Sequence, residues 1–356
     1  MFELLNLNLP NHQNKYNEAL RIIGQKRPYD SIQFFESFSD GLENLVCLVY
    51  RDSQKIFLLP GYLKSLPETN YVDFISPYGY SGPILSNDAD DQFIEKAWSV
   101  TTDYFKSAFV VSCFIRFALD ANTLGFPGEV KSTMKNIKGR ILPVEDQWKG
   151  ADRKVKKNYK KSMREGLTYK IVKGLDLSED DLAEFNSIYF DTMIRNNAHD
   201  NYFYSKDDFL NYTRNCGELC LFIFIYDEGK PVSVEMVLIS DESIFSFLGG
   251  TLSKAFDKRP NDLLKVELIN WARANNITYF VLGGGYGAED GIFKYKKTFF
   301  TNDVVDYFTG RWIVSPEKYS QILFKAKTNF KNLKGIIDEE LESKDYFPEY
   351  RKYMNN

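Results

Sequence analysis

The chain has 356 residues, of which 44% are hydrophobic and 26% charged, and its formal net charge is −4. This length exceeds one ordinary hydrophobic core, so we expect two domains. The slight negative charge gives no general attraction for nucleic acid, so we expect no DNA partner, and any anion site has to be local. The 29 phenylalanines and 23 tyrosines favour β-rich packing and ring-lined pockets.

Cysteine and histidine usage argues against a metal site. Four cysteines and two histidines occur without any CxxC pairing, so we expect no zinc site and free, buried thiols in a reducing compartment. The N-terminus lacks the basic-then-apolar pattern of a signal peptide, and no apolar run approaches the ~20 residues of a membrane span. We therefore expect a cytoplasmic protein.

The first half of the chain alternates between helical and strand-like patterns. An Asp52-Ser53 turn separates two apolar runs, which is typical of a hairpin. The patterns predict helices over residues 11–24 and 89–107, and strands over residues 45–50, 56–59, 71–75 and 108–117.

Residues 76–83 form a turn-rich aromatic loop that contains Tyr78 and Tyr80. The loop can be a well-packed turn without further function. Alternatively, the two phenols project into a cleft, where ring and hydroxyl suit a sugar or peptide substrate.

A basic helix is predicted from residue 148 to residue 166. Its apolar stripe repeats every four residues, and it carries eight basic residues against the acidic Asp152 and Glu165. The basic residues are Lys149, Arg153, Lys154, Lys156, Lys157, Lys160, Lys161 and Arg164. This face is either a solvated helix surface or a track for phosphates of a nucleotide-linked substrate, a coenzyme or an RNA end.

The second half repeats the mixture of elements. The patterns predict helices over residues 178–196, 205–214 and 260–275, and strands over residues 219–226, 232–240, 243–248, 279–282 and 304–314. A last helix begins at Ser315-Pro316, because serine caps helices and proline favours their first position.

The helix over residues 178–196 ends in a polar cluster that includes Arg195 and Asn196. A solvated helix end explains this cluster. Alternatively, the planar guanidinium of Arg195 clamps a carboxylate or phosphate.

The most informative segment is Gly283-Gly284-Gly285-Tyr286-Gly287-Ala288-Glu289-Asp290, which directly follows a buried strand. Glycines there let the backbone approach a ligand closely. Aromatic residues and lysines follow over residues 291–299, a mixture that suits an acyl group and an anion together. Neither GxxxxGK[ST], GxGxxG nor GxSxG occurs, so the common nucleotide and serine-hydrolase motifs do not apply.

Together these pieces resemble the Fem-type (FemAB-like) branch of the GNAT acyltransferase superfamily, over roughly residues 40–310. The segments that carry the resemblance are the aromatic loop, the basic helix, residues 189–197, Gly229-Lys230-Pro231-Val232, Gly249-Gly250-Thr251, Trp271-Ala272, the triple glycine, Asp290 and residues 293–299.

The resemblance implies an α/β fold of two tandem GNAT-like domains, each a twisted mixed sheet flanked by helices. We place them at residues 1–150 and 151–356, with the basic helix linking them and the C-terminal helix in the second. The family includes enzymes that transfer an amino acid from aminoacyl-tRNA onto a peptidoglycan precursor, and relatives that acylate amines of sugars or other small molecules.

The resemblance also implies site residues. The family's aromatic-lysine pair at the acyl-transfer centre matches Tyr295-Lys296, with Lys294 beside it. Amide formation develops negative charge on a carbonyl oxygen, which a lysine ammonium or the backbone N–H groups of Gly283, Gly284 and Gly285 can stabilise. A carboxylate such as Asp290 or Glu235 can help to remove the proton of the amine.

The chain departs from acetyl-CoA-dependent GNAT domains at residues 252–261, which lack the glycine-rich pyrophosphate loop. Lys258 and Arg259 can still meet phosphate at the start of the following helix. We expect no permanently bound cofactor, and aminoacyl-tRNA or acyl-CoA as co-substrate.

We therefore predict an acyl- or aminoacyltransferase that forms an amide on an amine of a cell-envelope precursor, of the peptidoglycan-peptide type. Tyr78, Tyr80, Arg195 and Asn196 would hold the acceptor, and Arg153 and Lys157 would hold phosphates. One alternative is an acyl-CoA-dependent N-acyltransferase acting on an amino sugar of surface polysaccharide. A second is a non-catalytic double-GNAT module that binds tRNA or a nucleotide-sugar.

Overall fold

The computed structural model describes residues 1–120, 122–285, 287, 289–334 and 345–354, with residues 333 and 334 described by their backbone. The chain divides into two compact units. Unit 1 comprises Met1–Gly24, Asp40–Thr133 and Tyr307–Asn356, and unit 2 comprises Gln25–Ser39 and Met134–Asp306.

This division differs from the single boundary expected near residue 150. The predicted C-terminal helix, α10 (Pro316–Lys334), belongs to unit 1 because Tyr319, Ile322 and Phe330 pack in one cluster with Val111 of that unit. Conversely, an N-terminal segment, Gln25–Ser39, belongs to unit 2.

The strands of unit 1 follow the order β1-β2-β3-β4-β6-β13, with β5 paired to β3. Only β4 and β6 are parallel, and α3 connects β5 to β6. The strands are β1 (Phe2–Asn6), β2 (Leu45–Asp52), β3 (Lys55–Ser65), β4 (Val72–Ile75), β5 (Ile84–Leu85), β6 (Val110–Arg116) and β13 (Val304–Ile313). The helices are α1 (Pro10–Ile23), α3 (Asp91–Ser107), α10 (Pro316–Lys334) and α11 (Glu349–Met354).

The strands of unit 2 follow the order β7-β12-β11-β10-β9-β8, and only β11 and β12 are parallel. The strands are β7 (Glu129–Arg140), β8 (Thr168–Lys173), β9 (Cys220–Asp227), β10 (Lys230–Ile239), β11 (Ser243–Thr251) and β12 (Tyr279–Gly283). The α-helices are α2 (Ile32–Phe38), α4 (Val144–Gly150), α5 (Arg153–Arg164), α6 (Glu179–Arg195), α7 (Lys206–Cys216), α8 (Pro260–Ala274) and α9 (Gly291–Lys297). Short 3-10 helices are η1 (Pro28–Asp30), η2 (Gly174–Asp176), η3 (Asp200–Tyr202), η4 (Gly217–Leu219) and η5 (Ser253–Lys258).

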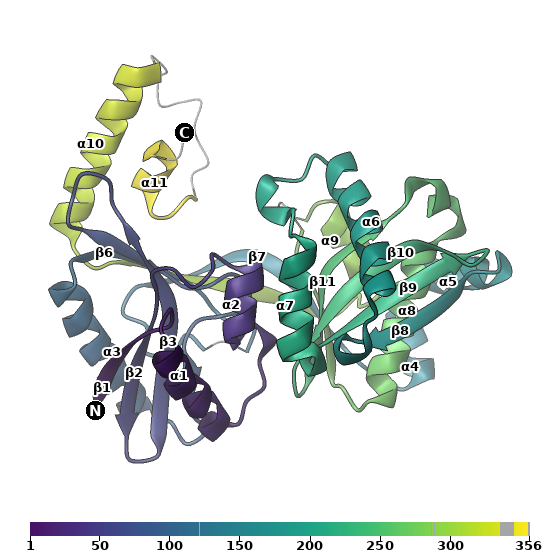
Figure 1. Cartoon of the computed structure of the whole chain (residues 1–356), viewed down its shortest axis with the longest axis horizontal. Helices are drawn as coiled ribbons and strands as arrows, with labels where there is room; N and C mark the ends of the chain where they lie inside the picture. The colour runs from purple at the N-terminus through teal and green to yellow at the C-terminus, as the bar shows by residue number, and fades with distance from the viewer. Residues whose placement is uncertain (121, 286, 288, 335–344, 355–356) are drawn as a thin grey trace. The chain divides into compact units, whose positions relative to one another are not determined.

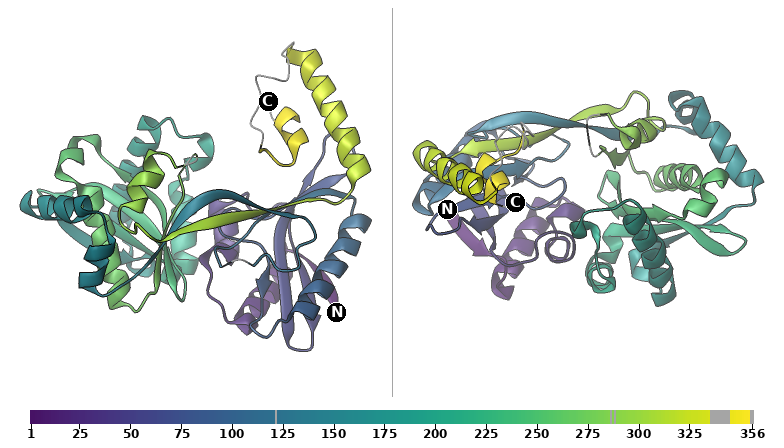
Figure 2. Two further views of the ribbon diagram at one scale, coloured as in Figure 1. Left: turned by 180° about the vertical axis from the view of Figure 1, so that it is seen from behind. Right: turned by 90° about the horizontal axis from the view of Figure 1, so that it is seen from above.

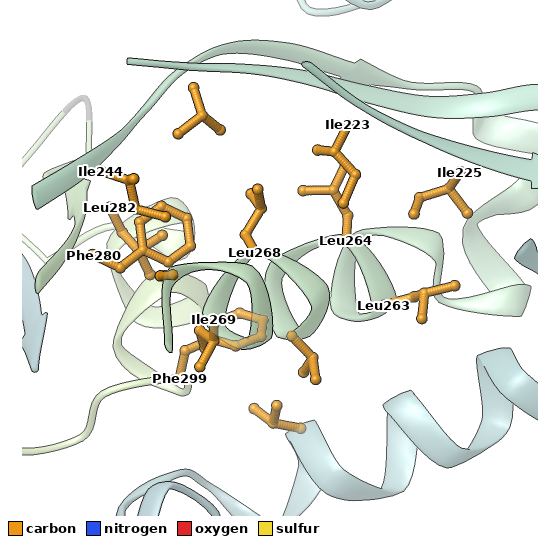
Figure 3. Close-up of a cluster of buried hydrophobic side chains, with 14 of the residues drawn as sticks. Ile223, Ile225, Ile244, Leu263, Leu264, Leu268, Ile269, Phe280, Leu282 and Phe299 are labelled. Atoms are coloured by element: carbon orange, nitrogen blue, oxygen red, sulfur yellow. The ribbon is translucent and has the colours of Figure 1, made fainter. Parts of the chain in front are cut away.

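The core of unit 2 lies on both faces of its sheet, as alternation along a strand requires. On β9, Ile223 and Ile225 face α8 and pack with its Leu264 and Leu268 (Figure 3). Phe222, which directly precedes Ile223, points to the other face and packs against Phe185 of α6, with 5.1 Å between the ring centroids. Helix α8 therefore covers one face and α6 the other (Figure 1).

Unit 1 is built in the same way. Trp98 and Phe105 of α3 pack with Phe57 and Phe74 of the sheet. Helices α10 and α11 lie beside each other and cover β6 through Val111 (Figures 1 and 2).

The predicted basic helix is in fact two helices. Helix α4 ends at Gly150, and Asp152 begins α5 by accepting a hydrogen bond from the Lys154 N–H at 2.7 Å. An aspartate is a strong N-cap, so it interrupts a pattern that otherwise reads as continuous.

Four strands, β1, β5, β7 and β8, lie outside the predicted elements, and β7 and β8 show the reason. Most side chains of β7 before Asn136 are exposed, as are those of Thr168, Tyr169 and Lys170 in β8. These strands therefore carry little of the apolar signal from which strands are predicted. The predicted helices 11–24, 89–107, 178–196, 205–214 and 260–275, and the strands of residues 219–248, are confirmed.

Candidate functional site

The parallel strands of unit 2 pair over a short length. Pairing joins Ser243–Phe245 of β11 to Tyr279–Val281 of β12, although β11 continues to Thr251. Beyond Phe245 and Val281 the two strands stop pairing with each other. Backbone groups on the facing edges are thus available to an extended ligand, as in strand addition.

The triple glycine begins where this pairing has ended. Gly283 has φ = 75°, a left-handed conformation that favours glycine, and pairs with Ile137 of β7. A Cβ on Gly284 would lie 2.9 Å from the Lys135 carbonyl and the Asn136 side chain. Because glycine has no Cβ, the backbone at Gly284 can pass this close to β7. Tyr286 and Ala288 of the motif lie outside the described residues.

Asp290 begins helix α9. Its Oδ1 accepts a hydrogen bond from the Phe293 N–H at 2.8 Å, and its Oδ2 accepts one from the Gly287 N–H at 3.3 Å. A Cβ on Gly285 would lie 2.1 Å from the same carboxylate. The geometry gives Asp290 the role of an N-cap, and its predicted catalytic role stays a prediction.

Lys296 lies on α9 and reaches back to the triple glycine. Its Nζ donates a hydrogen bond to the Gly284 carbonyl oxygen at 2.7 Å. Burial, followed by the positive charge of Lys265, lowers the pKa of Lys296 to about 8, against the opposing influence of Glu235 and Asp290. Lys296 therefore places a largely protonated ammonium at the end of β12 near neutral pH.

A buried ion pair lies within electrostatic reach of Lys296. The Lys265 ammonium of α8 donates to both carboxylate oxygens of Glu235 on β10, at 2.7 and 2.5 Å, and to Ser246 Oγ of β11 at 2.8 Å. Both charged residues are 6% exposed. Both carboxylate oxygens of Glu235 are thus engaged by Lys265. These contacts do not support the predicted role of Glu235 as the base that removes the proton of the amine.

Tyr295, the partner of Lys296 in the predicted pair, points into the protein. Its ring packs edge-on against Phe299 at 5.3 Å, and its hydroxyl is buried without a hydrogen-bond partner among the described residues. Burial, followed by the charges of Asp262 and Glu235, raises the pKa of Tyr295. A buried, unsatisfied hydroxyl is uncommon in a folded protein and marks a place where a ligand or water is expected.

Asp262 lies in the first turn of α8 and is 5% exposed. Its Oδ1 accepts a hydrogen bond from the Asn158 amide of α5 at 3.1 Å. Burial raises the pKa of Asp262, although Asn158 and Arg259 oppose the shift.

The two predicted cofactor-binding residues differ in their surroundings. Lys258 forms an ion pair with Asp227, with Nζ–O distances of 2.9 and 2.7 Å, so it is engaged within the protein. Arg259 is exposed and adopts φ = 62° directly before the first turn of α8. Of the two, Arg259 is the one presented to a phosphate at the helix N-terminus.

Arg195 ends α6. Its guanidinium pairs with Asp191 at 3.1 Å, contacts Thr192 Oγ1 at 3.4 Å and stacks over Phe256 at 5.2 Å. Asn196 follows as the exposed C-cap residue. Their predicted role in acceptor binding stays a prediction.

Helix α5 presents a row of cations opposite its buried Val155. Among the described residues, none of its basic side chains forms an ion pair, although Lys156 stacks over Trp148 at 5.6 Å. Arg153 and Lys157, the predicted phosphate ligands, belong to this row. The basic side chains of α5 are Arg153, Lys154, Lys156, Lys157, Lys160, Lys161 and Arg164. Lys294 of α9 is likewise exposed.

Tyr78 and Tyr80 lie in unit 1. Tyr78 is 42% exposed, whereas Tyr80 packs edge-on against Tyr307 at 5.7 Å. Burial raises the pKa of Tyr80. The packing of Tyr80 matches the structural alternative for this loop, and its predicted contact with substrate stays a prediction.

Sequence reasoning missed Lys265 and Asp262. Both lie in the predicted helix over residues 260–275, where residues 262–269 are all buried. Charged residues within an otherwise apolar helical segment were the available signal, because buried charges are rare unless paired or functional.

The described part of the chain contains no group of three His, Cys, Asp or Glu side chains arranged to hold a metal ion. Over the same residues, no helix combines the length and the apolar character that membrane crossing requires.

Residues 153–297, which lie within unit 2, match the family model of the acetyltransferase (GNAT) domain. No curated protein matches the sequence.

Several solved structures share the fold across most of the chain. FemX aligns with a TM-score of 0.65 at 11% identity, over 90% of this chain and 99% of FemX. L-PGS from Bacillus licheniformis aligns with a TM-score of 0.56 at 13% identity, over 90% and 98%. The C-terminal domain of a putative lysylphosphatidylglycerol synthetase from Agrobacterium fabrum aligns with a TM-score of 0.56 at 10% identity, over 89% and 97%. The predicted Fem-type GNAT fold and the acyltransferase class are confirmed.

Proposed function

We propose that this chain, an acyltransferase of the GNAT type, forms an amide by transferring an aminoacyl or acyl group onto an amine of a cell-envelope precursor. The observation that carries the proposal is the position of Lys296. Its ammonium contacts the Gly284 carbonyl where β11 and β12 have stopped pairing. A donor lying between these strands would place its carbonyl beside a half-buried cation.

Lys296 supplies the main catalytic effect in this proposal. As the amine attacks, negative charge develops on the carbonyl oxygen, and the ammonium donates to it instead of to Gly284. The site is partly withdrawn from water, so this interaction is stronger than at the surface. The opposite charges of Glu235 and Lys265 offset each other, so the ion pair adds no net charge next to Lys296.

Aminoacyl-tRNA is the favoured donor. The row of cations on α5, which form no ion pair with any described residue, suits a phosphate backbone, and Arg259 is exposed at the start of α8. The acceptor class, a peptidoglycan-type peptide amine, follows from the family resemblance. We place the reaction in the cytoplasm, where aminoacyl-tRNA and acyl-CoA are made.

The test is aminoacyl transfer from alanyl-tRNA to a UDP-linked muramyl peptide. Lys296→Ala should lower kcat by about 10²–10³, the usual cost of removing one donor to a developing oxyanion. The rate of the wild type should also fall as the pH rises through about 8, because Lys296 then loses its proton. Lys297→Ala, the exposed neighbour on α9, is the matched control and should keep the rate. A folded Lys296→Ala protein with the full rate would contradict the assignment.

Acyl-CoA is the second candidate donor, with an amino sugar as acceptor. It is favoured by the left-handed Arg259 at the start of α8, where a pyrophosphate can meet free N–H groups. Thermal-shift measurements with coenzyme A and with uncharged tRNA separate the donors, because a ligand stabilises the protein that binds it. A shift with coenzyme A alone would replace tRNA as the donor.

A further inference from the structure

Amide formation needs a proton acceptor, because the acceptor amine is an ammonium near neutral pH and only the neutral amine attacks. The two carboxylates predicted for this role are engaged elsewhere. Glu235 receives both of its short contacts from Lys265, and Asp290 caps α9.

Among the described residues, the other carboxylates buried in unit 2 have partners. Asp30 pairs with Arg27 at 2.8 Å. Asp181 pairs with Lys170 at 2.6 Å and accepts from Ser178 at 2.7 Å. Glu267 accepts from Tyr159 at 2.8 Å and from Asn270 at 3.2 Å.

Asp262 stands apart from these carboxylates. It receives one side-chain hydrogen bond, from the neutral amide of Asn158. No lysine or arginine nitrogen of the described residues lies within ion-pair distance of it, and the residue is 5% exposed. A buried carboxylate without a cation is costly, so a cationic ligand at this place would be strongly favoured.

The Tyr295 ring packs against the hydrophobic cluster that contains Leu263, the residue after Asp262 on α8, and the Tyr295 hydroxyl is buried without a partner among the described residues. It belongs to the residue directly before Lys296. Among the described residues, a carboxylate without an ion-pair partner and a hydroxyl without a hydrogen-bond partner thus belong to two elements that pack together, α8 and α9, and the hydroxyl precedes the residue assigned to the oxyanion.

We propose that Asp262 binds the ammonium group of the acceptor and takes up its proton, with the Tyr295 hydroxyl accepting a hydrogen bond from the same ammonium. This inference rests on the proposed function. Tyr295 is in this view a positioning residue, and Asp262 is the catalytic base.

The step balances without another reactant. One proton passes from the R–NH3+ group to the Asp262 carboxylate, which leaves R–NH2. The nitrogen lone pair then forms the C–N bond to the donor's ester carbonyl as the C–O bond breaks. The leaving ribose oxygen takes up a proton, either from Asp262 or from the amine nitrogen.

The pKa of Asp262 fits this task, because burial raises it and brings the carboxyl closer to the range in which a base works. Its position in the first turn of α8 places it one turn inward from the exposed Arg259.

The experiment compares Asp262→Asn with the wild type over about pH 6–8.5, using alanyl-tRNA and the UDP-linked muramyl peptide. Asparagine keeps the shape and the hydrogen bond with Asn158. We expect kcat at pH 7 to fall by about 10²–10⁴, the usual contribution of a general base. The remaining rate should rise tenfold per pH unit below about 8. With hydroxylamine, whose amine is neutral at pH 7, Asp262→Asn should transfer at the wild-type rate.

The matched control is Asp207→Asn, an exposed aspartate in the first turn of α7. A loss of rate that is the same with hydroxylamine, or a kcat within threefold of the wild type, would overturn the role of Asp262.

A binding measurement keeps the two proposals separable. Calorimetry with 1,5-diaminopentane should show binding to the wild type that Asp262→Asn abolishes and Tyr295→Phe weakens, whether or not transfer occurs. Binding with no transfer by the wild type would defeat the proposed substrates and leave the ammonium site standing. Binding that is equal in the wild type and Asp262→Asn would defeat the ammonium site alone.

Discussion

The two units share one strand plan but treat their parallel pair in opposite ways. In unit 1, all four residues of β4 pair with β6, and in unit 2, β11 pairs with β12 over three of its nine residues. Each unit therefore has one parallel pair of strands, with a position beyond the last paired residues where the strands can separate. The residues beyond each pair determine whether the strands stay separated there.

In unit 1, hydrogen bonds continue to join the chain segments beyond the paired residues of β4 and β6. The Ser76 N–H donates to the Phe114 carbonyl at 2.9 Å, and the Arg116 N–H donates to Ser76 Oγ at 2.9 Å. Asp73 on β4 is fully buried, and its carboxylate accepts from Ser112 at 2.8 Å and from Tyr350 and Arg351. This carboxylate is satisfied by side chains that hold the C-terminal helix α11 in place.

In unit 2 the corresponding place carries glycines and Lys296 instead. Charges there are paired in part, as in Glu235 with Lys265, and left open in part, as in Asp262. A satisfied polar cluster stabilises a fold, whereas one with missing partners is suited to a ligand. The comparison thus assigns chemistry to unit 2 and structural support to the parallel pair of unit 1.

The largest expected effect comes from breaking the buried pair of unit 2. Lys265→Met should lower the free energy of unfolding of unit 2 by about 3–5 kcal/mol, because it leaves Glu235 buried without its cation. The double variant Glu235→Leu/Lys265→Met should recover most of this loss. Urea denaturation gives the energies, and hydrogen exchange assigns them to unit 2. A double variant as unstable as the single would show that packing, not the unpaired charge, causes the loss.

A smaller effect is expected in unit 1. Tyr350→Phe removes one donor to Asp73 and should cost about 1–3 kcal/mol of stability, while the kcat of transfer stays unchanged. The same denaturation and transfer assays measure both quantities. A loss of kcat without a loss of stability would mean that the parallel pair of unit 1 takes part in the chemistry, which would break the comparison.

The smallest effect concerns α5, which lies between β7 and β8 of unit 2. Lys157→Ser/Lys160→Ser should weaken tRNA binding and reduce the slope of log affinity against log salt by about two, one per lysine. Binding is measured by filter retention over a series of salt concentrations. Lys96→Ser/Lys106→Ser on α3 of unit 1 serves as control and should leave the slope unchanged.

Sequence patterns predicted the elements whose apolar faces are regular. Helices α6 and α7 follow this rule, and both begin with a capping box, at Ser178 and Ser205. The strands β7 and β8 escaped prediction because their exposed polar residues carry no apolar alternation. The contact between Lys296 and the triple glycine agrees with the predicted neighbourhood of these two motifs.

By itself, the sequence determined the α/β class, the elements with regular apolar faces and the closeness of the triple glycine to Lys296, because these depend on local periodicity and on residues near each other in the chain. Only the tertiary structure decided which carboxylate is engaged. Glu235 meets Lys265 across 30 residues, and Asp262 meets Asn158 across 104. The availability of a buried charge depends on partners that are distant in the chain, so no local pattern can reveal it.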